Sequence, residues 1–469
     1  MRRKVEEVLR EWRVSDDKKC LIVSGARQIG KTFIVEEFAR SNYEYHLTVN
    51  FDQNPDACQA FSDRLDVDSI MLKLSAMYPN VNLVPKKTLI FLDEIQNCPE
   101  ARTSLKFFAI DGRYDVIASG SLLGLRDSEV PSYPVGYEHR IRMEPMDFEE
   151  FLWALNIKQE VIDHVKGCIR NRSPLGDSLL NTLSEYFRWY TVIGGMPEAV
   201  KSFVNNRTIR KVSEIHTDIF EDYKNDVIHH AKGSQKNNVS SCFDSISVQL
   251  SKENKKFQYS LIARNGTNGN DSKFGSNYYA YSLNWLKDAA IIRQCYNVTE
   301  PRMPLEERRM TDHFKIYMVD TGLLTSSYEP SVRVEILNGN LDVNRGALTE
   351  NVVAQMISAQ GRKLLYFSRD RDPESNATDR MEIDFLLIVN GRLTAVEVKS
   401  GKNRSCRSLN KIMDRYGIDG LMYETRDIFT DDKGVVHMPL FAAAFIDSMD
   451  THHGPEFDFD SIDRLNAQF

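Results

Sequence analysis

The sequence predicts an α/β protein that opens with a parallel sheet and a phosphate-binding loop. Residues 20–23 are a short apolar run typical of a buried strand, and residues 33–40 have the apolar spacing of a helix. Between them lies the glycine-rich segment GARQIGKT at 25–32. A second apolar run, TLIFL at 88–92, ends in two acidic residues, as a buried parallel strand with a polar carboxyl end would. The order of strand, loop and helix predicts the first unit of a P-loop fold.

The segment 25–32 fits the pattern G-x-x-x-x-G-K-[ST], in which each fixed residue has a physical task. Gly25 and Gly30 let the backbone turn its N–H groups onto phosphates at the start of a helix. Lys31 is expected to reach the β and γ phosphates, and the Thr32 hydroxyl to ligate Mg²⁺. The alternative is a chance glycine turn, but the strand before the loop and the helix after it favour a nucleotide site.

Two acidic residues, Asp93 and Glu94, follow the second apolar run. At the carboxyl end of a parallel strand Asp93 can hold the water shell of Mg²⁺, and Glu94 can polarise a water that attacks a γ-phosphate. A surface Asp-Glu pair after any strand is the alternative. The upstream phosphate loop favours the catalytic interpretation.

Small polar residues close a third predicted strand at 114–118. Ligands of parallel sheets bind outside the carboxyl ends of the strands, so Ser119 or Ser121 can sense the γ-phosphate. Both serines suit a simple small-residue turn equally well. The sequence leaves these two interpretations open.

Length and composition describe a multidomain globular chain. The 469 residues exceed what one core supports, and 42% hydrophobic with 27% charged residues is an ordinary composition. The longest apolar patch, 440–446, is too short to span a membrane, and no apolar segment follows the basic start at 1–4. We therefore expect a cytoplasmic protein without a membrane partner.

The seven cysteines are scattered and never form a C-x-x-C pair, so their spacing suggests neither disulfides nor zinc, and we interpret them as buried thiols. The net charge of −7 argues against a globally basic nucleic-acid wrapper but leaves room for a local basic groove.

Near the C-terminus, a strand at 381–388, a turn at Gly391 and a strand at 394–399 predict a β-hairpin. Glu397 and Lys399 are two residues apart on one strand and therefore point to the same face. They lie among valines in a strand that otherwise looks buried, and a buried Glu and Lys need either each other or a task.

Four motifs together resemble a family of prokaryotic AAA+ ATPases of the AAA_14 type: GARQIGKT, LDEIQ at 92–96, GSLL at 120–123 and PMDFEEFL at 145–152. Members of that family join the ATPase to a C-terminal DUF4143 region with a winged helix and a PD-(D/E)xK nuclease-like fold. The resemblance covers most of the chain and implies the cofactors ATP and Mg²⁺. It implies nucleotide contacts from Gly25, Gln28, Gly30, Lys31, Thr32, Asp93 and Ser121.

The resemblance implies a P-loop NTPase sheet of the AAA+/ASCE class with a helical lid, followed by a winged helix and a restriction-endonuclease-like α/β domain. The expected divisions are 1–145 for the ATPase core, 146–235 for the lid or spacer, 236–330 for the winged helix, 331–435 for the nuclease-like domain and 436–469 for a C-terminal tail.

The winged helix has a recognisable pattern of elements. We expect helices at 242–250, 259–263 and 278–288, a loop at 265–277, and strands at 291–298 and 315–319. Positive charge for DNA phosphates would come from Lys255, Lys256, Arg264, Lys273 and Lys287. Docking of a protein partner is an equally good interpretation of such a fold in an acidic chain.

For the nuclease-like domain the resemblance implies a metal site. Asp384 and Glu397 would bind Mg²⁺, Glu350 on a helix at 345–359 would join the metal shell, and Lys399 would activate water and stabilise the pentavalent phosphate. Structural pairing of Glu397 with Lys399 is the alternative, and an intact set need not be an active one.

One position departs from the family. Its members usually have Gly-Arg about nine residues before the proline of the PMDFEEFL motif, whereas here Tyr137 follows Gly136. In the family, that arginine is a candidate finger that reaches a neighbouring nucleotide. Arg140 or Arg142 can take its place here, or both can simply lie on a solvated face of a strand. Ring assembly is therefore left open by the sequence.

The leading functional hypothesis is an ATPase coupled to a nuclease-like domain that acts on nucleic acid. The alternatives are a nucleotide-dependent switch whose nuclease fold only binds DNA or protein, and a regulator in which the winged helix alone meets DNA.

Overall fold

The computed structural model describes residues 1–121, 134–230, 235–250, 256–257, 276–342, 346–371, 378–401 and 405–450. The chain forms two compact units, each assembled from three chain segments. Unit 1 contains 1–157, 188–294 and 315–355, and unit 2 contains 158–187, 295–314 and 356–469.

Unit 1 is built on a five-stranded sheet in the order β2-β3-β4-β1-β5, and each strand is parallel to its neighbours. This confirms the predicted α/β fold with a parallel sheet. The strands are β1 (Cys20–Ser24), β2 (Tyr45–Asn50), β3 (Thr88–Asp93), β4 (Asp115–Gly120) and β5 (Glu138–Arg142). All six residues of β3 are buried, which agrees with its continuous apolar run.

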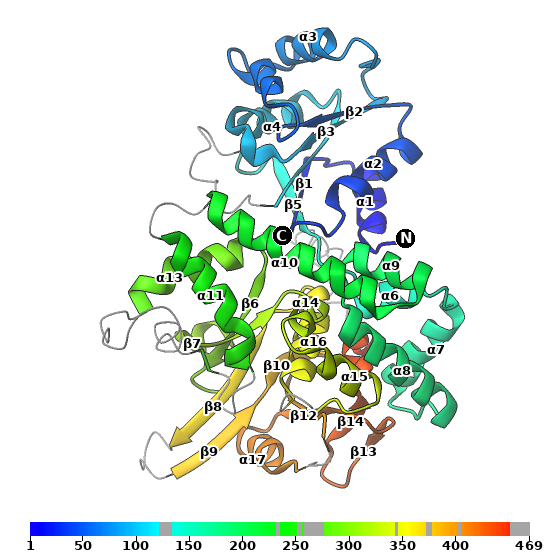
Figure 1. The fold of residues 1–469 in the computed structure, drawn as a ribbon, viewed down its shortest axis with the longest axis vertical. Helices are drawn as coiled ribbons and strands as arrows, with labels where there is room; N and C mark the ends of the chain where they lie inside the picture. The colour runs from blue at the N-terminus through cyan, green and yellow to red at the C-terminus, as the bar shows by residue number, and fades with distance from the viewer. Residues whose placement is uncertain are drawn as a thin grey trace, which may run out of the picture. The chain divides into compact units, whose positions relative to one another are not determined.

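Helices before and between these strands complete the layer structure around the sheet (Figure 1). They are α1 (Val5–Val14), α2 (Lys31–Asn42), η1 (Pro55–Phe61), α3 (Val67–Met77), η2 (Ile95–Asn97) and α4 (Pro99–Asp111). Residues of η1, α3 and α4 share one core with the sheet, where Ile22, Ile90 and Leu105 have no exposed surface. The carboxyl edge of the sheet stays clear of this core and holds the polar residues.

A helical region follows β5, where the resemblance implies a helical lid. Its elements in the chain are α6 (Phe148–Ala154), α7 (Gln159–Asn171), α8 (Asp177–Ile193), α9 (Pro197–Asn206) and α10 (Ile209–His230). α6, α9 and α10 belong to unit 1, whereas α7 belongs to unit 2 and α8 runs from one unit into the other. The segment expected as one lid or spacer at 146–235 therefore contributes to both units.

The Gly194-Gly195 turn between α8 and α9 holds a buried carboxylate. The N–H of Gly195 donates to Asp320 Oδ2 over 2.5 Å, and a Cβ at Gly194 (φ +72°) would lie 2.1 Å from Asp320 Oδ1. Only glycine fits here, because a side chain would collide with that carboxylate. The turn is thus a packing feature of unit 1.

The region expected to form a winged helix begins with two described helices, which two described strands follow. They are α11 (Gln235–Leu250), α13 (Ser276–Asp288), β6 (Ile292–Val298) and β7 (Arg309–Met318). The expected helix at 259–263 and most of the expected loop at 265–277 lie outside the described residues. The short helix η4 (Glu306–Arg308) lies just before β7, and α14 (Thr321–Ser326), α15 (Pro330–Leu337) and α16 (Ala347–Ala359) follow β7.

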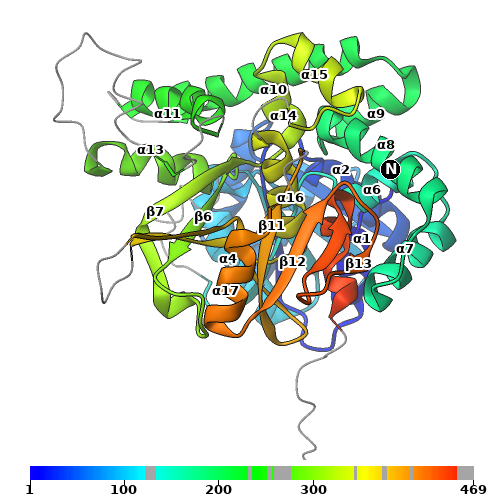
Figure 2. The same ribbon diagram turned by 90° about the horizontal axis from the view of Figure 1, so that it is seen from below.

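Unit 2 contains a five-stranded sheet in the order β10-β11-β12-β14-β13. Its strands are β10 (Phe385–Val389), β11 (Arg392–Val398), β12 (Asp419–Glu424), β13 (Phe429–Thr430) and β14 (Val436–Pro439). Helix α17 (Arg407–Tyr416) packs on β11 and β12 (Figure 2). A further sheet, in the order β7-β6-β8-β9, adds β8 (Leu365–Arg371) and β9 (Thr378–Ile383).

Two segments of unit 2 differ from the sequence-based expectation. The predicted strand at 381–388 is broken at Asp384 into β9 and β10, which pair in different sheets. Residues 436–449, expected as the start of a tail, form β14 and η5 (Leu440–Met449), and most of their side chains are buried. None of the helices within the described ranges has the length and apolar character of a membrane span.

Candidate active site

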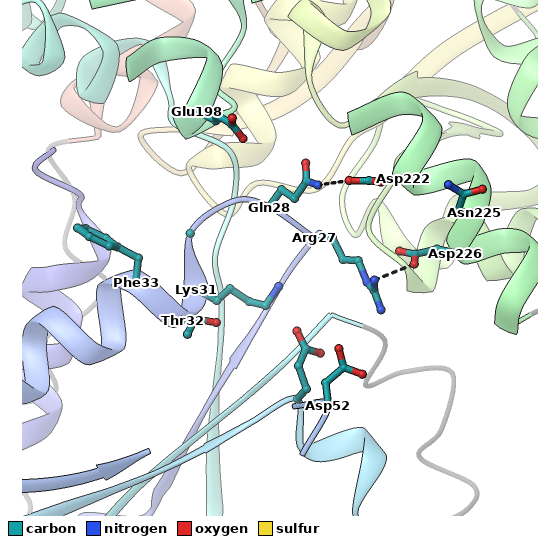
Figure 3. Close-up of a pocket in the computed structure, with 12 residues that line it drawn as sticks. Arg27, Gln28, Lys31, Thr32, Phe33, Asp52, Glu198, Asp222, Asn225 and Asp226 are labelled. Carbon is teal, nitrogen blue, oxygen red and sulfur yellow. Dashed lines mark hydrogen bonds and ion pairs between the residues drawn. The ribbon is translucent and has the colours of Figure 1, made fainter. Parts of the chain in front are cut away.

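A pocket of about 650 Å³ lies at the carboxyl edge of the sheet of unit 1 (Figure 3). The phosphate loop and the start of α2 form its floor, with Glu94 from the end of β3 and acidic residues from α10 at its rim. The lining side chains include Arg27, Gln28, Lys31, Thr32, Glu94, Glu198, Asp222 and Asp226. Most of these residues are charged or polar, which suits a charged ligand.

The loop conformation explains both glycines. Gly25 has φ +147°, and a Cβ there would lie 2.3 Å from the carbonyl oxygen of Met143. Gly30 is the N-cap of α2 with φ +88°, a left-handed conformation that glycine adopts without steric cost. The chain can therefore enter α2 with its first N–H groups directed at a ligand.

Lys31 is buried beneath this loop, with a relative exposure of 6%. Its Nζ donates to the carbonyl oxygens of Gly25 and Ala26, over 3.1 and 2.8 Å. Burial lowers the pKa of Lys31 to about 8, although the carboxylates of Glu94 and Asp93 oppose this shift. A phosphate beside Nζ would stabilise the ammonium form and reverse the effect of burial.

Asp93 is the centre of a hydrogen-bond cluster that joins the strands β2, β3 and β4 to helix α2. Its Oδ2 accepts from the Thr32 hydroxyl at 2.8 Å and from Asn50 Nδ2 at 2.9 Å, while Oδ1 accepts from the Ser119 hydroxyl. Thr32 and Asp93, the two residues predicted to hold Mg²⁺, are therefore adjacent. An oxygen-rich pair of this kind fits the ligand preference of Mg²⁺.

Glu94 lies next to this cluster in a left-handed backbone conformation, with φ +51°. Its Oε2 accepts hydrogen bonds from Gln96 Nε2 at 2.5 Å and from the Ser121 hydroxyl at 3.3 Å. The strained conformation turns Glu94 out of the direction of β3 and into the pocket. Ser119 and Ser121 therefore hold one carboxylate each.

Two residues inside the phosphate loop contact α10. Arg27 Nη1 is 2.8 Å from Asp226 Oδ1, and Gln28 Nε2 donates to Asp222 Oδ2 over 2.6 Å (Figure 3). The Tyr223 hydroxyl donates to the carbonyl oxygen of Arg27 over 3.2 Å. The sequence does not predict these partners, because its signal for them is an Asp pair four residues apart on one helix face.

Arg3 connects the phosphate loop to the PMDFEEFL motif and so gives that motif a structural role. Its Nη1 donates to the carbonyl oxygen of Ile29 over 3.0 Å, and its Nε is 3.1 Å from Glu150. Glu150 forms a capping box with Asp147 at the start of α6. Burial raises the pKa of Glu150, and Asp147 adds to this, against the opposing charge of Arg3. The motif thus supports the loop rather than the ligand.

The two candidate arginine fingers lie on β5, which is an edge strand. Arg140 is 3.4 Å from Glu138, and Arg142 is 2.9 Å from Glu144, in both cases between charged atoms. These pairs are intramolecular and partly exposed. Arg140 and Arg142 are therefore two positively charged side chains at the edge of the sheet, and their ion pairs do not show which of them would act as an arginine finger.

In unit 2, the predicted hairpin of β10 and β11 is present, and Phe385 pairs with Val396. This register places Asp384 opposite Glu397 at the open end of the hairpin. Asp384 Oδ2 accepts from the backbone N–H of Val398 over 2.9 Å, and Glu397 forms an ion pair with Lys399. Burial alone would lower the pKa of Lys399, but the carboxylates of Glu397 and Asp384 raise it.

Glu350 is on α16 in unit 1, where its relative exposure is 3%. Its Oε1 accepts from Lys315 Nζ over 3.0 Å and from the Tyr317 hydroxyl. The structure therefore groups Asp384, Glu397 and Lys399 in one unit and describes Glu350 with partners of its own in the other.

The parallel sheet, the phosphate loop and the Asp93-Glu94 pair define a P-loop ATPase domain. Family models agree: an AAA domain, AAA_14, matches residues 17–152, and two domains of unknown function, DUF8612 and DUF4143, match 184–329 and 345–441. The chain therefore carries an AAA_14-type ATPase domain and a C-terminal DUF4143 region, as the sequence motifs predicted.

Comparison with curated protein sequences gave no match. Among solved structures, the Walker-type ATPase PABY2304 of Pyrococcus abyssi has 13% identity and a TM-score of 0.40, over 70% of this chain and 95% of that one. The Aeropyrum pernix ORC1 protein in complex with DNA has 11% identity and a TM-score of 0.27, over 73% and 92%. AMPPCP-bound DnaA from Aquifex aeolicus has 13% identity and a TM-score of 0.26, over 60% of this chain and 86% of that one. These scores are low, so the assignment depends on the family models and the site.

Proposed function

We propose that the chain binds Mg-ATP in the pocket of unit 1 and hydrolyses it with Glu94 as the residue that polarises the attacking water. The observation that supports this most directly is the hydrogen bond between Thr32 and Asp93, which brings the two expected magnesium ligands to 2.8 Å at the mouth of the phosphate loop.

Each residue has a task that follows from its position. Lys31 and the N–H groups at the start of α2 bind the phosphates, while Thr32 and Asp93 hold Mg²⁺, which neutralises charge on the β and γ phosphates. Glu94 orients the water and accepts its proton, and Ser121 and Gln96 fix the Glu94 carboxylate by donating to it.

The test separates binding from turnover. Lys31→Ala removes a buried positive charge and should weaken ATP binding by roughly 10–100-fold, as expected for a lost charge-assisted hydrogen bond. Glu94→Gln should retain ATP affinity and lose about 10²–10⁴-fold in hydrolysis. Glu37→Gln, an exposed carboxylate on α2, is the matched control. Normal hydrolysis in Glu94→Gln would refute the role of Glu94.

We further propose that this ATPase is coupled to a metal-dependent nuclease-like site at Asp384, Glu397 and Lys399. Two carboxylates opposite each other at one hairpin end, with a lysine beside them, provide a cation site and a positive charge for a phosphodiester. Glu350 is the predicted fourth member, and a metal would have to replace Lys315 as the partner of its carboxylate.

The competing function is a nucleotide-dependent switch in which the same fold binds DNA or protein without cleavage. Its support is the ion pair of Glu397 with Lys399, which satisfies both charges without a metal. Incubation of the full chain with single- and double-stranded DNA and RNA, with Mg²⁺ or Mn²⁺ and with or without ATP, distinguishes the two. Cleavage that Asp384→Ala abolishes supports the nuclease, and no cleavage under any of these conditions supports the switch.

For the 236–330 region we propose a winged-helix-like platform with weak, electrostatic DNA affinity. Lys287 lies in the last turn of α13, and Lys256 is the other described lysine of the predicted basic set. DNA affinity should fall linearly with salt on logarithmic axes, with a slope that decreases by about one for each lysine removed. Lys201→Ala, on α9, is the control. Affinity that is independent of salt would favour a protein partner.

A further inference from the structure

Unit 2 contains a cluster of a thiol, a carboxylate and an imidazole that the ATPase and the nuclease-like site do not use. One ligand atom from each of Cys406, Asp431 and His437 lies within 4.8 Å of the others. The three residues come from three places in the chain: the N-cap of α17, the turn between β13 and β14, and β14 itself. Their spacing in the sequence matches no zinc motif, so only the fold reveals the group.

From this geometry we propose that Cys406, Asp431 and His437 bind a divalent transition metal of the zinc class. Sulfur, imidazole nitrogen and carboxylate oxygen form the ligand set that Zn²⁺ prefers. In a tetrahedral zinc site, metal–ligand distances of about 2.0–2.3 Å leave neighbouring ligand atoms roughly 3–4 Å apart. His437 Nε2 and Asp431 Oδ2 are 3.4 Å apart, which fits this value.

The surroundings of His437 orient it as a metal ligand. Nδ1 lies 2.5 Å from Glu424 Oε1, and Nε2 faces Asp431 Oδ2. With a proton on Nδ1 donated to Glu424, Nε2 would offer its lone pair to a metal. The Phe429 ring stacks on the imidazole at 4.2 Å and 9°, which fixes the ring plane. A carboxylate behind a histidine is the arrangement that orients metal-bound imidazoles in proteins.

Asp431 is equally restrained. Its Oδ1 accepts from the N–H groups of Lys433 and Val435, each over 2.9 Å, which leaves Oδ2 directed at His437. Arg426 is 2.6 Å from Glu424 and approaches His437 on the Nδ1 side of the ring, 3.4 Å from that atom. The side that carries Nε2 is therefore the one available to a metal.

A metal here would join three segments of unit 2 that are far apart in the sequence. Three protein ligands leave one position of a tetrahedral zinc for water or another small ligand. Because the metal would bind the folded protein only, it should also stabilise the fold in proportion to the logarithm of its free concentration. This proposal is independent of the nucleotide site and of Asp384.

The experiment uses Co²⁺ as a spectroscopic substitute for Zn²⁺. The full chain, stripped with a chelator, is expected to take up one equivalent of Co²⁺ with a thiolate-to-metal absorption band that Zn²⁺ then displaces. Cys406→Ser should lose the band, whereas Cys58→Ser, a partly buried thiol in unit 1, should keep it. Glu424→Gln should weaken Zn²⁺ binding by about 10–100-fold, as expected for a partner behind the ligating histidine.

Asp431→Asn provides a second variant in case Cys406→Ser does not fold, because its amide oxygen can still accept from Lys433 and Val435. It should lower Zn²⁺ affinity, measured by competition with a chromogenic chelator, and should reduce the rise in melting temperature that Zn²⁺ produces. Absence of the thiolate band in the folded parent protein, or an unchanged band in Cys406→Ser, overturns the proposal. His437 would then be a structural residue that only bridges the carboxylates of Glu424 and Asp431.

Discussion

Arg27 Nη1 lies 2.8 Å from Asp226 Oδ1, so the phosphate loop is tied to helix α10 by an ion pair. A second bond, from Gln28 to Asp222, repeats the connection one helical turn earlier. Arg27 and Gln28 of the phosphate loop are therefore bound to carboxylates, at the rim where an anionic ligand is expected. A bound triphosphate would compete with both carboxylates for these two side chains.

The first prediction is that Asp226→Asn strengthens ATP binding. The substitution removes a negative charge from the rim and frees Arg27 for a phosphate. The pair is partly exposed, so the gain should be modest, up to about fivefold. ATP affinity is measured by calorimetry beside Asp218→Asn, an exposed residue of the same helix. Weaker binding in Asp226→Asn alone would mean that the ion pair positions the loop for ATP.

A pH dependence follows from the buried ammonium of Lys31, whose pKa is about 8 in the folded protein. A triphosphate favours the charged form, so ATP binding should take up a proton above about pH 8, and affinity should fall up to tenfold per pH unit. Calorimetry in buffers of different ionisation enthalpy measures this uptake. Lys31→Arg should not show it, because arginine keeps its proton.

The same pKa affects stability in the opposite direction. The folded value of about 8 is below the ordinary value of 10.5, so the unfolded chain binds more protons between these two values. The buried charge therefore disfavours folding below pH 8, and this penalty decreases as the pH rises towards 10.5. Lys31→Met should remove the penalty and raise the melting temperature at neutral pH.

The arginine-finger hypothesis gives a third prediction. If Arg140 or Arg142 replaces the arginine that Tyr137 lacks, its change to alanine should reduce hydrolysis by about 10³-fold or more without changing ATP affinity. Their present partners, Glu138 and Glu144, are on the same strand or just after it, so loss of either ion pair should barely change stability. Parental turnover in both variants would show that neither residue is a finger.

The nuclease-like site gives the fourth prediction. Asp384→Ala should weaken Mn²⁺ binding and stop any cleavage, whereas Lys399→Ala should retain the metal and lose only the chemistry. Asp419→Ala, a partly exposed aspartate on β12, is the control. Equal Mn²⁺ uptake by the parent and Asp384→Ala would leave Glu397 and Lys399 as a structural ion pair.

The sequence predicted the phosphate loop and Asp93-Glu94 because these are local patterns on continuous apolar strands. It could not predict Asn50, Asp222 or Arg3, since each meets its partner only through tertiary folding and carries no motif of its own. Cys406 and His437 were missed for the same reason. Neither belongs to a ligand-spacing pattern, and only the turn before β14 brings them together.

The break at Asp384 shows why the apolar pattern predicted one strand where the structure has two. The apolar pattern at 381–388 is continuous, so it predicts one strand. The Asp384 carboxylate instead accepts a backbone N–H from Val398, and the chain changes sheets at this residue. A side chain that competes with the ladder for a backbone donor is not visible in an apolar pattern.

The interleaving of the two units has a consequence for synthesis. Domains made of one continuous stretch can fold as soon as they leave the ribosome. Here unit 1 needs residues 315–355, so the phosphate loop is translated long before the last segment of its own unit exists, and 158–187 must wait for 356–469. We expect nascent chains shorter than about 355 residues to resist proteases poorly, and no single truncation to yield either unit intact.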